Sequence, residues 1–385
     1  MAGDRPPLGI GLIGSGYLGK AYTLGYRSAP NVFGAELGAD ELELVAESTP
    51  ESAELARTTL GFTRATHDWR ALVADPKVDL VIVNTPNKLH LPMAMAAIRA
   101  GKHVHCEKPL ALSLEGAGAM TEAAERAGVR TIVGFNYRQN PATLLAKEII
   151  ESGEIGEIVG VRATHNEDYD ADPTKPATWK AKRAETGAGA LFDVGSHIIS
   201  IIRYLVGPIT EVTADLHQVI AERSASDGSS GSVAIETEDQ ARFLCRFERG
   251  ASGVIECSRI AWGRRMFLSY EITGTKGSLW FDQERMSELH LFTAADGWAR
   301  GGFRRILVNE HHPRYAGFGM GPGHGVGFND QKIIEAAEML AAIRENRAAS
   351  PDFREATAVQ AVMDAVLRSH GTRGWERVAK GAAPA

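Results

Sequence analysis

Two short segments carry side chains suited to moving a proton. Glu107-Lys108-Pro109 follows a strand-like run, and a lysine there could polarise a reacting hydroxyl and shift its proton toward a base; an exposed Lys-Pro turn is the alternative. Asp193 and His197 are four residues apart, which places them on one face of a helix among apolar neighbours. A histidine near a helix N-terminus tends to stay neutral, as a general base requires. A helix-capping aspartate and a histidine satisfied in the core would also account for this pair.

A glycine-rich segment is the strongest local motif of the chain. Residues 14–19 read Gly-Ser-Gly-Tyr-Leu-Gly, after a strand-like run and before a helix-like stretch. In a dinucleotide-binding turn of this kind, the first glycine permits the tight turn, the second lets main chain approach a pyrophosphate, and the third lets the helix pack on the strand. The helix N-terminus adds N–H groups that favour phosphate. A chance glycine-rich turn is the alternative. The predicted cofactor contacts are Gly14, Ser15, Gly16, Tyr17 and Leu18.

Glu47 ends the second strand-like run, where an acid can accept hydrogen bonds from the adenosine ribose. It lies further from the glycines than the usual spacing of about 20 residues, because residues 29–41 are predicted to form a loop-like insertion. Residues 48–56 contain no lysine or arginine that could hold a 2′-phosphate. The pattern therefore favours NAD over NADP. A solvated acid at a strand end is the alternative.

Polar residues also follow the strand-like run at residues 78–84. Because the carboxyl ends of strands in an open parallel sheet face the ligand crevice, groups at this edge could contact the nicotinamide ribose. A plain turn that caps the following helix is the alternative. The cofactor contacts predicted here and at the Glu-Lys-Pro segment are Thr85, Pro86, Asn87, His90, Glu107 and Lys108.

The first third of the chain alternates strand-like and helix-like segments. The predicted strands are residues 8–13, 42–46, 78–84, 103–106 and 131–135, and the predicted helices are residues 17–28, 51–60, 69–74, 89–100 and 114–127. Alternation with mostly apolar strands predicts a parallel sheet that is covered by helices on both faces, which is a doubly wound α/β architecture.

The pattern changes after about residue 135. A helix over residues 141–152 leads to a strand over 158–165, a polar stretch over 166–189 and an apolar helix over 191–206. Strands follow at 211–220, 238–247, 253–261, 267–273, 278–281 and 288–292 without helices between them, which predicts a large, mostly antiparallel sheet. Residues 224–232 form a flexible turn, residues 316–327 a glycine-rich loop, and helices over 328–347 and 354–369 close the chain. The predicted domains are residues 1–135 and 136–385.

Composition limits the classes of function. The chain has 385 residues, 44% of them hydrophobic and 23% charged, which predicts a soluble protein of two domains. Its net charge of −6 argues against nucleic acid or an anionic membrane as the main partner. We find no apolar run near the length of about 20 residues that a membrane span needs, and no signal peptide, so a cytoplasmic location is expected. Three scattered cysteines predict no disulfide framework, and His311, His312 and His324 lack the companions of a metal site.

Taken together, GLIGSGYLG, TPNKLH, CEKP and GALFDVGSH, in this order, resemble the glucose–fructose oxidoreductase/inositol dehydrogenase/rhizopine catabolism (Gfo/Idh/MocA) family. The resemblance covers essentially the whole chain. It implies an N-terminal Rossmann domain, a C-terminal domain with an open antiparallel sheet, a nicotinamide nucleotide cofactor and sugars or cyclitols as substrates. It also implies dimers or tetramers that form through the open sheet face. The C-terminal segments look most like inositol 2-dehydrogenase-like and levoglucosan dehydrogenase-like members.

The resemblance implies Lys108, Asp193 and His197 as the catalytic triad, and a Lys108–Pro109 bond that can be cis. It also aligns Glu47 with an Asp of NAD-dependent inositol dehydrogenases. A polar set around the predicted domain junction suits a polyhydroxylated ligand, although each member alone could be an ordinary loop residue. The predicted substrate contacts are Lys108, Tyr137, Arg138, Asn166, Trp179, Asp193, His197 and His324.

The resulting hypothesis is a dehydrogenase that oxidises a ring hydroxyl of a cyclic sugar or cyclitol to a ketone with NAD⁺. His197 would remove the hydroxyl proton, Lys108 would stabilise the developing alkoxide, and Asp193 would hold the substrate. One alternative is an epimerase or glycoside-cleaving enzyme that passes through a transient keto sugar and recycles its cofactor. The other is a non-catalytic sugar sensor, which would be expected to have lost Lys108 or His197. The expected partners are a small sugar or cyclitol and further copies of the chain, as a dimer or homotetramer.

Overall fold

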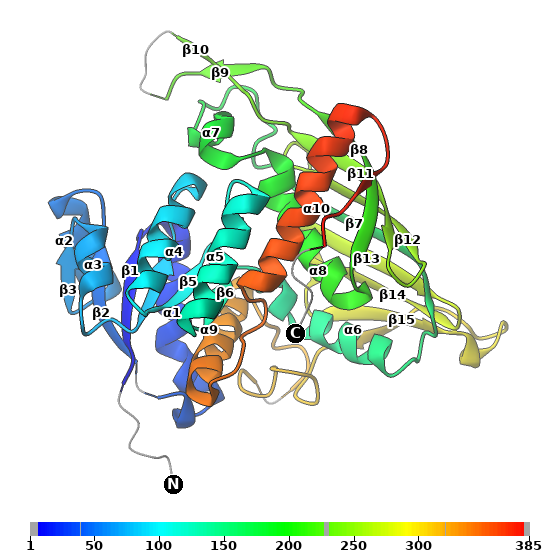
Figure 1. Ribbon diagram of the computed structural model, residues 1–385. Helices are drawn as coiled ribbons and strands as arrows, with labels where there is room; N and C mark the ends of the chain where they lie inside the picture. The colour runs from blue at the N-terminus through cyan, green and yellow to red at the C-terminus, as the bar shows by residue number, and fades with distance from the viewer. Residues whose placement is uncertain (1–6, 39, 227–230, 320, 381–385) are drawn as a thin grey trace. The chain divides into compact units, whose positions relative to one another are not determined.

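The protein is described from a computed structural model over residues 7–38, 40–226, 231–319 and 321–380. The chain forms two compact units (Figure 1). The first contains residues up to Asn136 together with residues 327–357, and the second contains residues 137–326 and those from 358 onward. The domain division at residue 135 stays a prediction. The first six residues, the tip of the predicted turn at 227–230 and position 320 of the glycine-rich loop lie outside the described residues.

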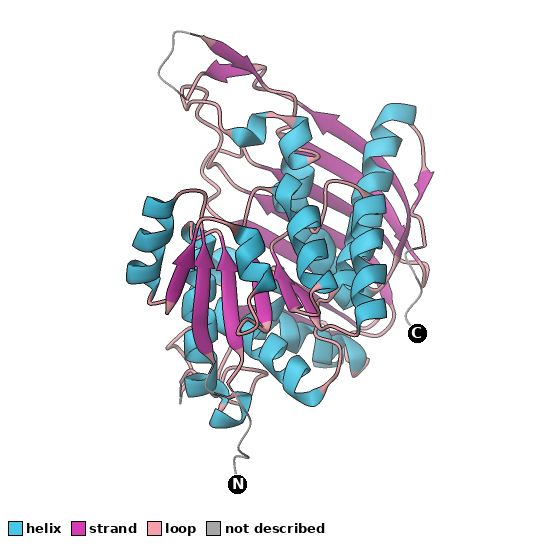
Figure 2. Ribbon diagram, turned by 60° about the vertical axis from the view of Figure 1, so that its left-hand side comes forward, coloured by secondary structure: helices cyan, strands magenta, loops and turns pink. Residues whose placement is uncertain are grey.

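A parallel sheet forms the centre of the first unit. Over the described residues it has six strands in the order β3-β2-β1-β4-β5-β6, all paired in parallel. Figure 2 shows these strands side by side. This order confirms the predicted doubly wound architecture, in which ligands bind beyond the carboxyl ends of the strands where the order reverses, here between β1 and β4. The strands are β1 (Gly9–Ile13), β2 (Glu41–Ala46), β3 (Arg64–Thr66), β4 (Leu80–Val83), β5 (His103–Cys106) and β6 (Thr131–Val133).

The helices of this unit carry recognisable start and stop signals. Thr49 caps one helix in a capping box, and Ser113 accepts the N–H of Gly116 at the start of another, which ends at Gly128 in the left-handed conformation. The helices are α1 (Tyr17–Phe33), α2 (Pro50–Leu60), α3 (Trp69–Ala74), α4 (His90–Arg99), α5 (Leu114–Ala127) and α9 (Phe328–Glu345), with 3-10 turns at Ala35–Leu37 and Asn87–Leu89. A 3-10 turn at Asn136–Gln139 belongs mostly to the second unit.

The loop predicted over residues 29–41 is wrong in its first half. Helix α1 continues through Pro30 to Phe33, and the 3-10 turn follows. Tyr26 and Ala29 are fully buried on the helix face that continues into this region. We infer that their burial outweighs the main-chain hydrogen bond that a proline removes near the end of a helix.

The second unit contains a mixed, mostly antiparallel sheet, as predicted. In the described part of the chain it has nine strands in the order β16-β15-β14-β13-β7-β12-β11-β8-β17, and β7 with β12 is its parallel pair. The strands are β7 (Ile158–Asn166), β8 (Ile209–His217), β11 (Gln240–Phe247), β12 (Ser252–Ser258), β13 (Phe267–Gly274), β14 (Gly277–Asp282), β15 (Glu288–Thr293), β16 (Arg304–Leu307) and β17 (Glu376–Arg377). A hairpin of β9 (Glu222–Ser224) and β10 (Ser232–Ala234) stands apart from it.

This sheet has one covered face and one open face. Along β11 the residues alternate, so that Phe243 and Cys245 are buried while Arg242 and Leu244 are exposed. Helix α8 packs on the buried side against β7 and β13. The helices of this unit are α6 (Pro141–Glu151), α7 (Arg183–Thr186), α8 (Ser196–Val206) and the larger part of α10 (Phe353–Thr372), with a 3-10 turn at Trp179–Ala181 and two more at Gln283–Arg285 and Ala294–Asp296.

The apolar helix predicted over residues 191–206 is not a uniform α-helix. Its first turn, Leu191–Gly195, is π-helical, and α8 begins at Ser196. The stretch Arg183–Val206 is also long and apolar enough for a membrane span by composition, contrary to the sequence-based expectation, but 78% of the apolar window is buried, as in a core helix. Two glycines let this segment approach the sheet: a Cβ on Gly195 would lie 2.9 Å from the Cys257 sulfur, and one on Gly189 would lie 2.0 Å from the Glu238 carbonyl oxygen.

We therefore expect Gly189→Ala to lower the free energy of unfolding by roughly 1–3 kcal/mol, because the new methyl group would overlap a main-chain oxygen. Denaturant unfolding of the purified protein measures this effect. Gly160→Ala on β7 is the matched control, since a Cβ there meets nothing within 4 Å. Equal stability of the two variants would contradict the close approach of Gly189 to the Glu238 main chain.

Candidate active site

The glycine-rich turn is shaped by close contacts that only glycine permits. Gly14 has a φ of 92°, and a Cβ there would lie 2.1 Å from the Asn84 carbonyl oxygen. The Asn84 side chain donates to the Gly14 carbonyl at 2.9 Å, so the ends of β1 and β4 are tied together. A Cβ on Gly19 would lie 2.5 Å from the Gly14 oxygen. The predicted reasons for the first and third glycines are therefore present in the geometry.

The start of α1 is open to a ligand. A Cβ on Gly16 would meet nothing within 4 Å, and α1 begins at Tyr17 without a side-chain cap or an acid in its first turn. Tyr17 is 73% exposed and stacks on Phe328 at 5.9 Å. An uncapped helix N-terminus beside an accessible glycine fits the phosphate groups of a dinucleotide.

Glu47 lies beside this turn, as the sequence predicts. Its Oε1 accepts the main-chain N–H of Ser15 and, at 2.6 Å, the Ser15 hydroxyl. These bonds hold the carboxylate at the mouth of the glycine turn, where an acid can accept hydrogen bonds from ribose hydroxyls. A fixed negative charge at this place also disfavours a 2′-phosphate.

His90 braces the sheet edge rather than facing outward. The side chain is buried, with Nδ1 2.8 Å from the Pro109 carbonyl oxygen and Nε2 2.9 Å from the Thr85 carbonyl oxygen. Burial lowers the pKa of His90 below its usual value, against the opposing effect of these carbonyls. His90 therefore links the segment of Thr85, Pro86 and Asn87 to the Glu-Lys-Pro segment. Its direct contact with a cofactor stays a prediction.

Lys108 lies half-buried directly after β5, and the Lys108–Pro109 peptide bond is cis, as the family resemblance implies. Glu107 is buried, and its Oε2 accepts the N–H of Lys108 at 3.0 Å. The carboxylate of Glu107 thus points into the unit and holds main chain, while Lys108 is the more exposed member of the pair.

The second unit places His197 in an aromatic setting. His197 is buried on the first turn of α8, and the Tyr137 ring meets it edge-on at 4.7 Å. The His165 ring lies 5.7 Å away, with Nδ1 2.8 Å from the Val194 carbonyl oxygen and Nε2 2.9 Å from the Glu167 carboxylate. These contacts fix the rings around His197 and bring together two residues that the sequence predicts for one site, Tyr137 and His197.

Asp193 is held from outside its own helix. Its Oδ2 accepts the Tyr169 hydroxyl at 2.6 Å and the Lys180 ammonium at 2.5 Å, and Lys180 also lies 5.0 Å from the Tyr169 ring centroid. Burial and the Asp193 charge hold the pKa of Tyr169 well above its usual value, so its hydroxyl stays a donor at neutral pH. A carboxylate fixed by a cation and a hydroxyl beside a buried histidine can orient a substrate hydroxyl for proton transfer.

Three other predicted substrate residues have local roles. The guanidinium of Arg138, which is buried, lies 4.1 Å from the Tyr204 ring centroid on α8. Asn166 follows His165 along β7, so its side chain points to the opposite sheet face, where it donates to Glu256. Trp179 is partly exposed on the 3-10 turn that also carries Lys180. Trp179 is thus next in sequence to a residue that contacts Asp193, whereas the Asn166 side chain does not face His197.

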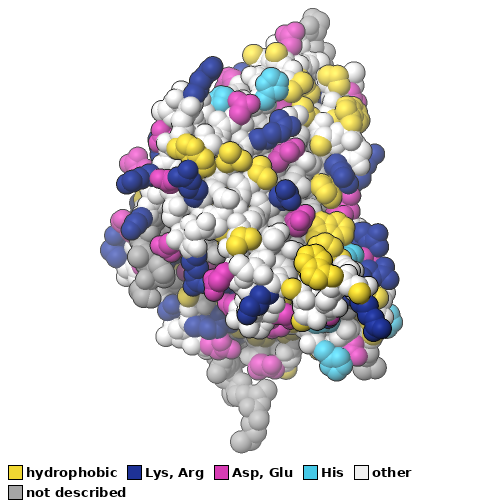
Figure 3. Space-filling model, turned by 90° about the vertical axis from the view of Figure 1, so that its right-hand side faces the viewer, with side chains coloured by type: hydrophobic (Ala, Val, Ile, Leu, Met, Phe, Trp, Pro, Cys, Tyr) yellow, Lys and Arg dark blue, Asp and Glu magenta, His cyan; other side chains and the backbone are white. Residues whose placement is uncertain are grey.

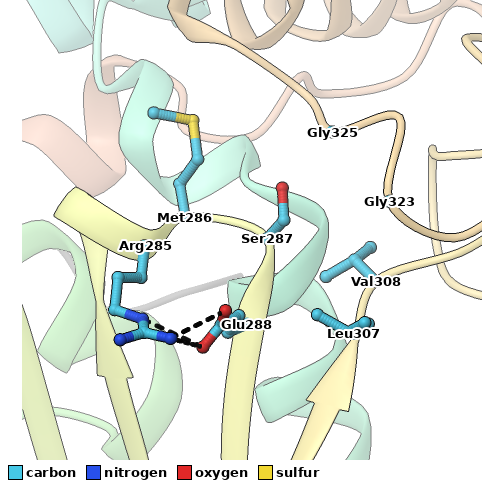
Figure 4. A pocket seen from close by; sticks show the side chains of 8 residues that line it. All are labelled: Arg285, Met286, Ser287, Glu288, Leu307, Val308, Gly323 and Gly325. Atoms are coloured by element: carbon cyan, nitrogen blue, oxygen red, sulfur yellow. Dashed lines mark hydrogen bonds and ion pairs between the residues drawn. The ribbon is translucent and has the colours of Figure 1, made fainter.

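His324 lies between two glycines that line a cavity of about 300 Å³ (Figure 4). The wall also contains Met286 and an Arg285–Glu288 ion pair of 3.0 Å. Asn140, the cap of α6, donates to the Met286 carbonyl at 3.1 Å and so ties the cavity wall to this helix. His324 is itself exposed, and its role in binding substrate stays a prediction.

Glu238 holds the main chain before His197, and the sequence does not predict this role. Its Oε1 accepts the N–H groups of Gly189 at 2.8 Å and Leu191 at 3.0 Å, so a distant buried carboxylate caps the π-helical turn. Local sequence gives no signal for this cap, because the residues are almost 50 positions apart. Tyr169 and Lys180 are different, because both belong to the polar set before the apolar helix that the sequence offers for a polyhydroxylated ligand.

A doubly wound sheet with a glycine turn and a neighbouring acid, in a chain whose second sheet carries an Asp–His helix, defines a two-unit dinucleotide-dependent oxidoreductase. Residues 8–135 match the family described as "Oxidoreductase family, NAD-binding Rossmann fold", and residues 143–280 match the "GFO/IDH/MocA C-terminal domain". The chain belongs to the Gfo/Idh/MocA family of NAD-dependent oxidoreductases, which confirms the resemblance.

Relatives extend the match to almost the full length. Levoglucosan dehydrogenase of Pseudarthrobacter phenanthrenivorans is 38% identical over 379 residues, which are 96% of this chain and 97% of that protein. Scyllo-inositol 2-dehydrogenase (NAD(+)) of Bacillus subtilis is 32% identical over 70% of this chain and 74% of its own length. A solved structure of levoglucosan dehydrogenase in complex with NADH and levoglucosan covers 97% of this chain and 100% of its own, with a TM-score of 0.94 and 38% identity.

Tyr169 and Lys180 together form a clamp on the Asp193 carboxylate, and this clamp leads to a testable expectation. Lys180→Met should lower kcat/KM of NAD-dependent oxidation roughly 10- to 100-fold, since it removes a charged hydrogen bond to Asp193. Lys182→Met is the matched control two residues on, because Lys182 pairs with exposed Glu236 and should change kcat/KM by less than about threefold. Similar losses in both variants would contradict a specific role for the Asp193 clamp.

Proposed function

We propose that this protein is an NAD-dependent dehydrogenase that oxidises a ring hydroxyl of a cyclic sugar or cyclitol to a ketone. Levoglucosan or a closely related anhydro sugar is the first substrate to test, with inositols next. The observation that carries the proposal is the nearly full-length match to levoglucosan dehydrogenase. The polar surroundings of Asp193 and His197 support it, because a polyol needs several fixed donors and acceptors.

In the proposed mechanism Lys108, Asp193 and His197 act on one substrate hydroxyl. Asp193, held by Tyr169 and Lys180, accepts a hydrogen bond from the substrate and orients it. His197 takes the hydroxyl proton, while the positive charge of Lys108 stabilises the developing alkoxide. When bound, NAD⁺ would accept the hydride from the carbon that bears this hydroxyl. The products would be a ketone, NADH and a proton.

We propose that the dinucleotide is held by the glycine turn and Glu47, with NAD preferred over NADP. The accessible Gly16, the uncapped start of α1 and the Glu47 carboxylate beside Ser15 support this assignment. The groups at Thr85, Pro86 and Asn87 would contact the nicotinamide side of the cofactor, and His90 would hold their main chain in place.

NADH formation tests the activity directly. We expect absorbance at the NADH band to rise with NAD⁺ and at least one of levoglucosan, myo-inositol, scyllo-inositol, glucose, xylose or a glycoside, and to rise far less with NADP⁺. The expected cofactor preference follows from repulsion between Glu47 and a 2′-phosphate. Product formation from a glycoside or sugar without net NADH would contradict the dehydrogenase and favour an epimerase or glycoside-cleaving enzyme that recycles its cofactor.

Two substitutions test the acid–base assignment. Lys108→Met and His197→Asn should each lower kcat roughly 100- to 10,000-fold, because each removes a group that acts on the moving proton. NADH affinity, measured by fluorescence titration, should change little. Lys77→Met, an exposed lysine of the first unit, is the control and should keep full turnover. Turnover near that of the unmodified protein in both site variants would refute the assignment.

We also propose that copies of the chain associate through the open face of the second sheet. A groove of about 530 Å³ runs across it, and Val159, Leu244, Val254 and Trp375 on its walls are exposed. Figure 3 shows hydrophobic side chains between charged ones on the side of the molecule where β12 to β15 lie in Figure 1. A dimer or homotetramer would cover this surface.

A further inference from the structure

A lysine is fully buried in the first unit, away from solvent. Lys332 lies on α9, and its Nζ donates to the Tyr22 hydroxyl at 3.0 Å, to Glu107 Oε1 at 3.3 Å and to Glu335 Oε2 at 2.9 Å. A buried ammonium group is costly unless oxygen atoms compensate its lost hydration. Three oxygens of the first unit therefore surround this one charge, and one of them belongs to Glu107, the residue before Lys108.

Close packing of α1 on α9 places Lys332 there. A Cβ on Gly25 of α1 would lie 2.7 Å from the Lys332 carbonyl oxygen, so glycine lets the two helices approach. Tyr22 precedes Gly25 by about one helical turn, and the Lys332 ammonium lies 4.2 Å from the Tyr22 ring centroid. The tyrosine hydroxyl in turn donates to Glu107 Oε1.

Both oxygens of the Glu107 carboxylate are engaged. Oε1 accepts from Tyr22 and Lys332, and Oε2 accepts the main-chain N–H of Lys108 at 3.0 Å. On the other side of Lys108, the Pro109 carbonyl oxygen meets the buried ring of His90 at 2.8 Å. The main chain is thus held immediately before and immediately after Lys108.

The charges in this cluster favour a Lys332–Glu107 ion pair. Burial tends to raise the pKa of Glu107, but the charges of Lys332 and Lys108 outweigh it, and the pKa lies below its usual value. Burial raises the pKa of Glu335 to about 7, and burial with the charge of Lys332 holds the pKa of His105 well below its usual value. His105 is therefore neutral at physiological pH, and Glu107 is the carboxylate that most fully carries its charge.

We propose that Lys332 and Tyr22 are positioning residues for Lys108: they fix the Glu107 carboxylate, which in turn fixes the main chain from which the Lys108 ammonium reaches the substrate. This inference rests on the proposed role of Lys108 and extends it to a residue more than 200 positions away in the sequence. A displacement of about 1 Å at a catalytic group can cost up to 100-fold in rate, so such positioning has a measurable effect.

Two tyrosines of α1 provide the matched test. Tyr22→Phe removes the hydroxyl that Glu107 accepts, while Tyr26→Phe removes an equally buried hydroxyl that lies 2.8 Å from His105 Nδ1. In crystal structures of the two variants, we expect the Glu107 carboxylate and the Lys108 main chain to shift or to adopt two conformers in Tyr22→Phe and to stay in place in Tyr26→Phe. With a sugar substrate, kcat should fall roughly 10-fold or more in Tyr22→Phe, with KM and NADH affinity within about threefold of the unmodified protein.

Substitutions of Lys332 test the charge itself. Lys332→Met should lower kcat roughly 10- to 100-fold with little change in KM, and Lys332→Arg should restore most of the loss because it returns a cation to Glu107. If Lys332→Met does not fold because it leaves buried carboxylates unpaired, the tyrosine pair still decides the question.

The outcomes separate the inference from the proposed function. A folded Tyr22→Phe variant with an unmoved Lys108 and full turnover would overturn the inference, and so would equal losses of kcat in Tyr22→Phe and Tyr26→Phe, which indicate a stability effect alone. Absence of turnover in the unmodified protein with every sugar would overturn the proposed dehydrogenase instead. In that case the position of Lys108 in the two tyrosine variants would still confirm or overturn the positioning role.

Discussion

Carboxylates that accept main-chain N–H groups hold three of the segments on which the proposed chemistry depends. Glu47 accepts the N–H of Ser15 in the glycine turn, Glu107 accepts that of Lys108, and Glu238 accepts two at the start of the π-helical turn before His197. A charged acceptor makes a stronger hydrogen bond than a neutral one, and it restrains backbone rather than a flexible side chain. The reactive side chains therefore extend from a main chain that is fixed in place. Orientation of a substrate requires this arrangement.

Much of the fold could be predicted because the local spacing of apolar residues in the sequence indicates it. Apolar runs and glycine or serine boundaries predict five of the first unit's strands and the start of α1 at Tyr17. Prediction fails where tertiary contacts decide. Strand β3 has only three half-buried residues and no pattern of its own, and α1 passes through Pro30 because buried neighbours outweigh the lost hydrogen bond. The π-helical turn at Leu191 likewise depends on a cap from Glu238 and on contact with the sheet.

The site divides in the same way. Motif spacing brings the glycine turn and Glu47 together, and it places Asp193 and His197 on one helical segment, but the partners that orient Asp193 lie outside the motif. Lys180 reaches Asp193 from a 3-10 turn, and nothing in the run around Lys332 distinguishes it from an ordinary helical surface lysine. Asn166 shows the opposite limit: it ends a strand in a suitable region, yet the two-residue repeat of the strand directs its side chain to the other face of the sheet.

The return of residues 327–357 to the first unit also sets an order of assembly. When residues up to 136 have been synthesised, Tyr22, His105 and Glu107 are present, but the lysine that compensates them lies almost 200 residues further on. At a synthesis rate of about 5–20 residues per second, this gap lasts roughly 10–40 s. During that time the nascent first unit would have to bury a carboxylate without its counter-charge or leave the α9-facing side of α1 exposed. The first unit thus completes its core only after strands β7 to β16 have been synthesised, so its folding depends on the synthesis of most of the second sheet.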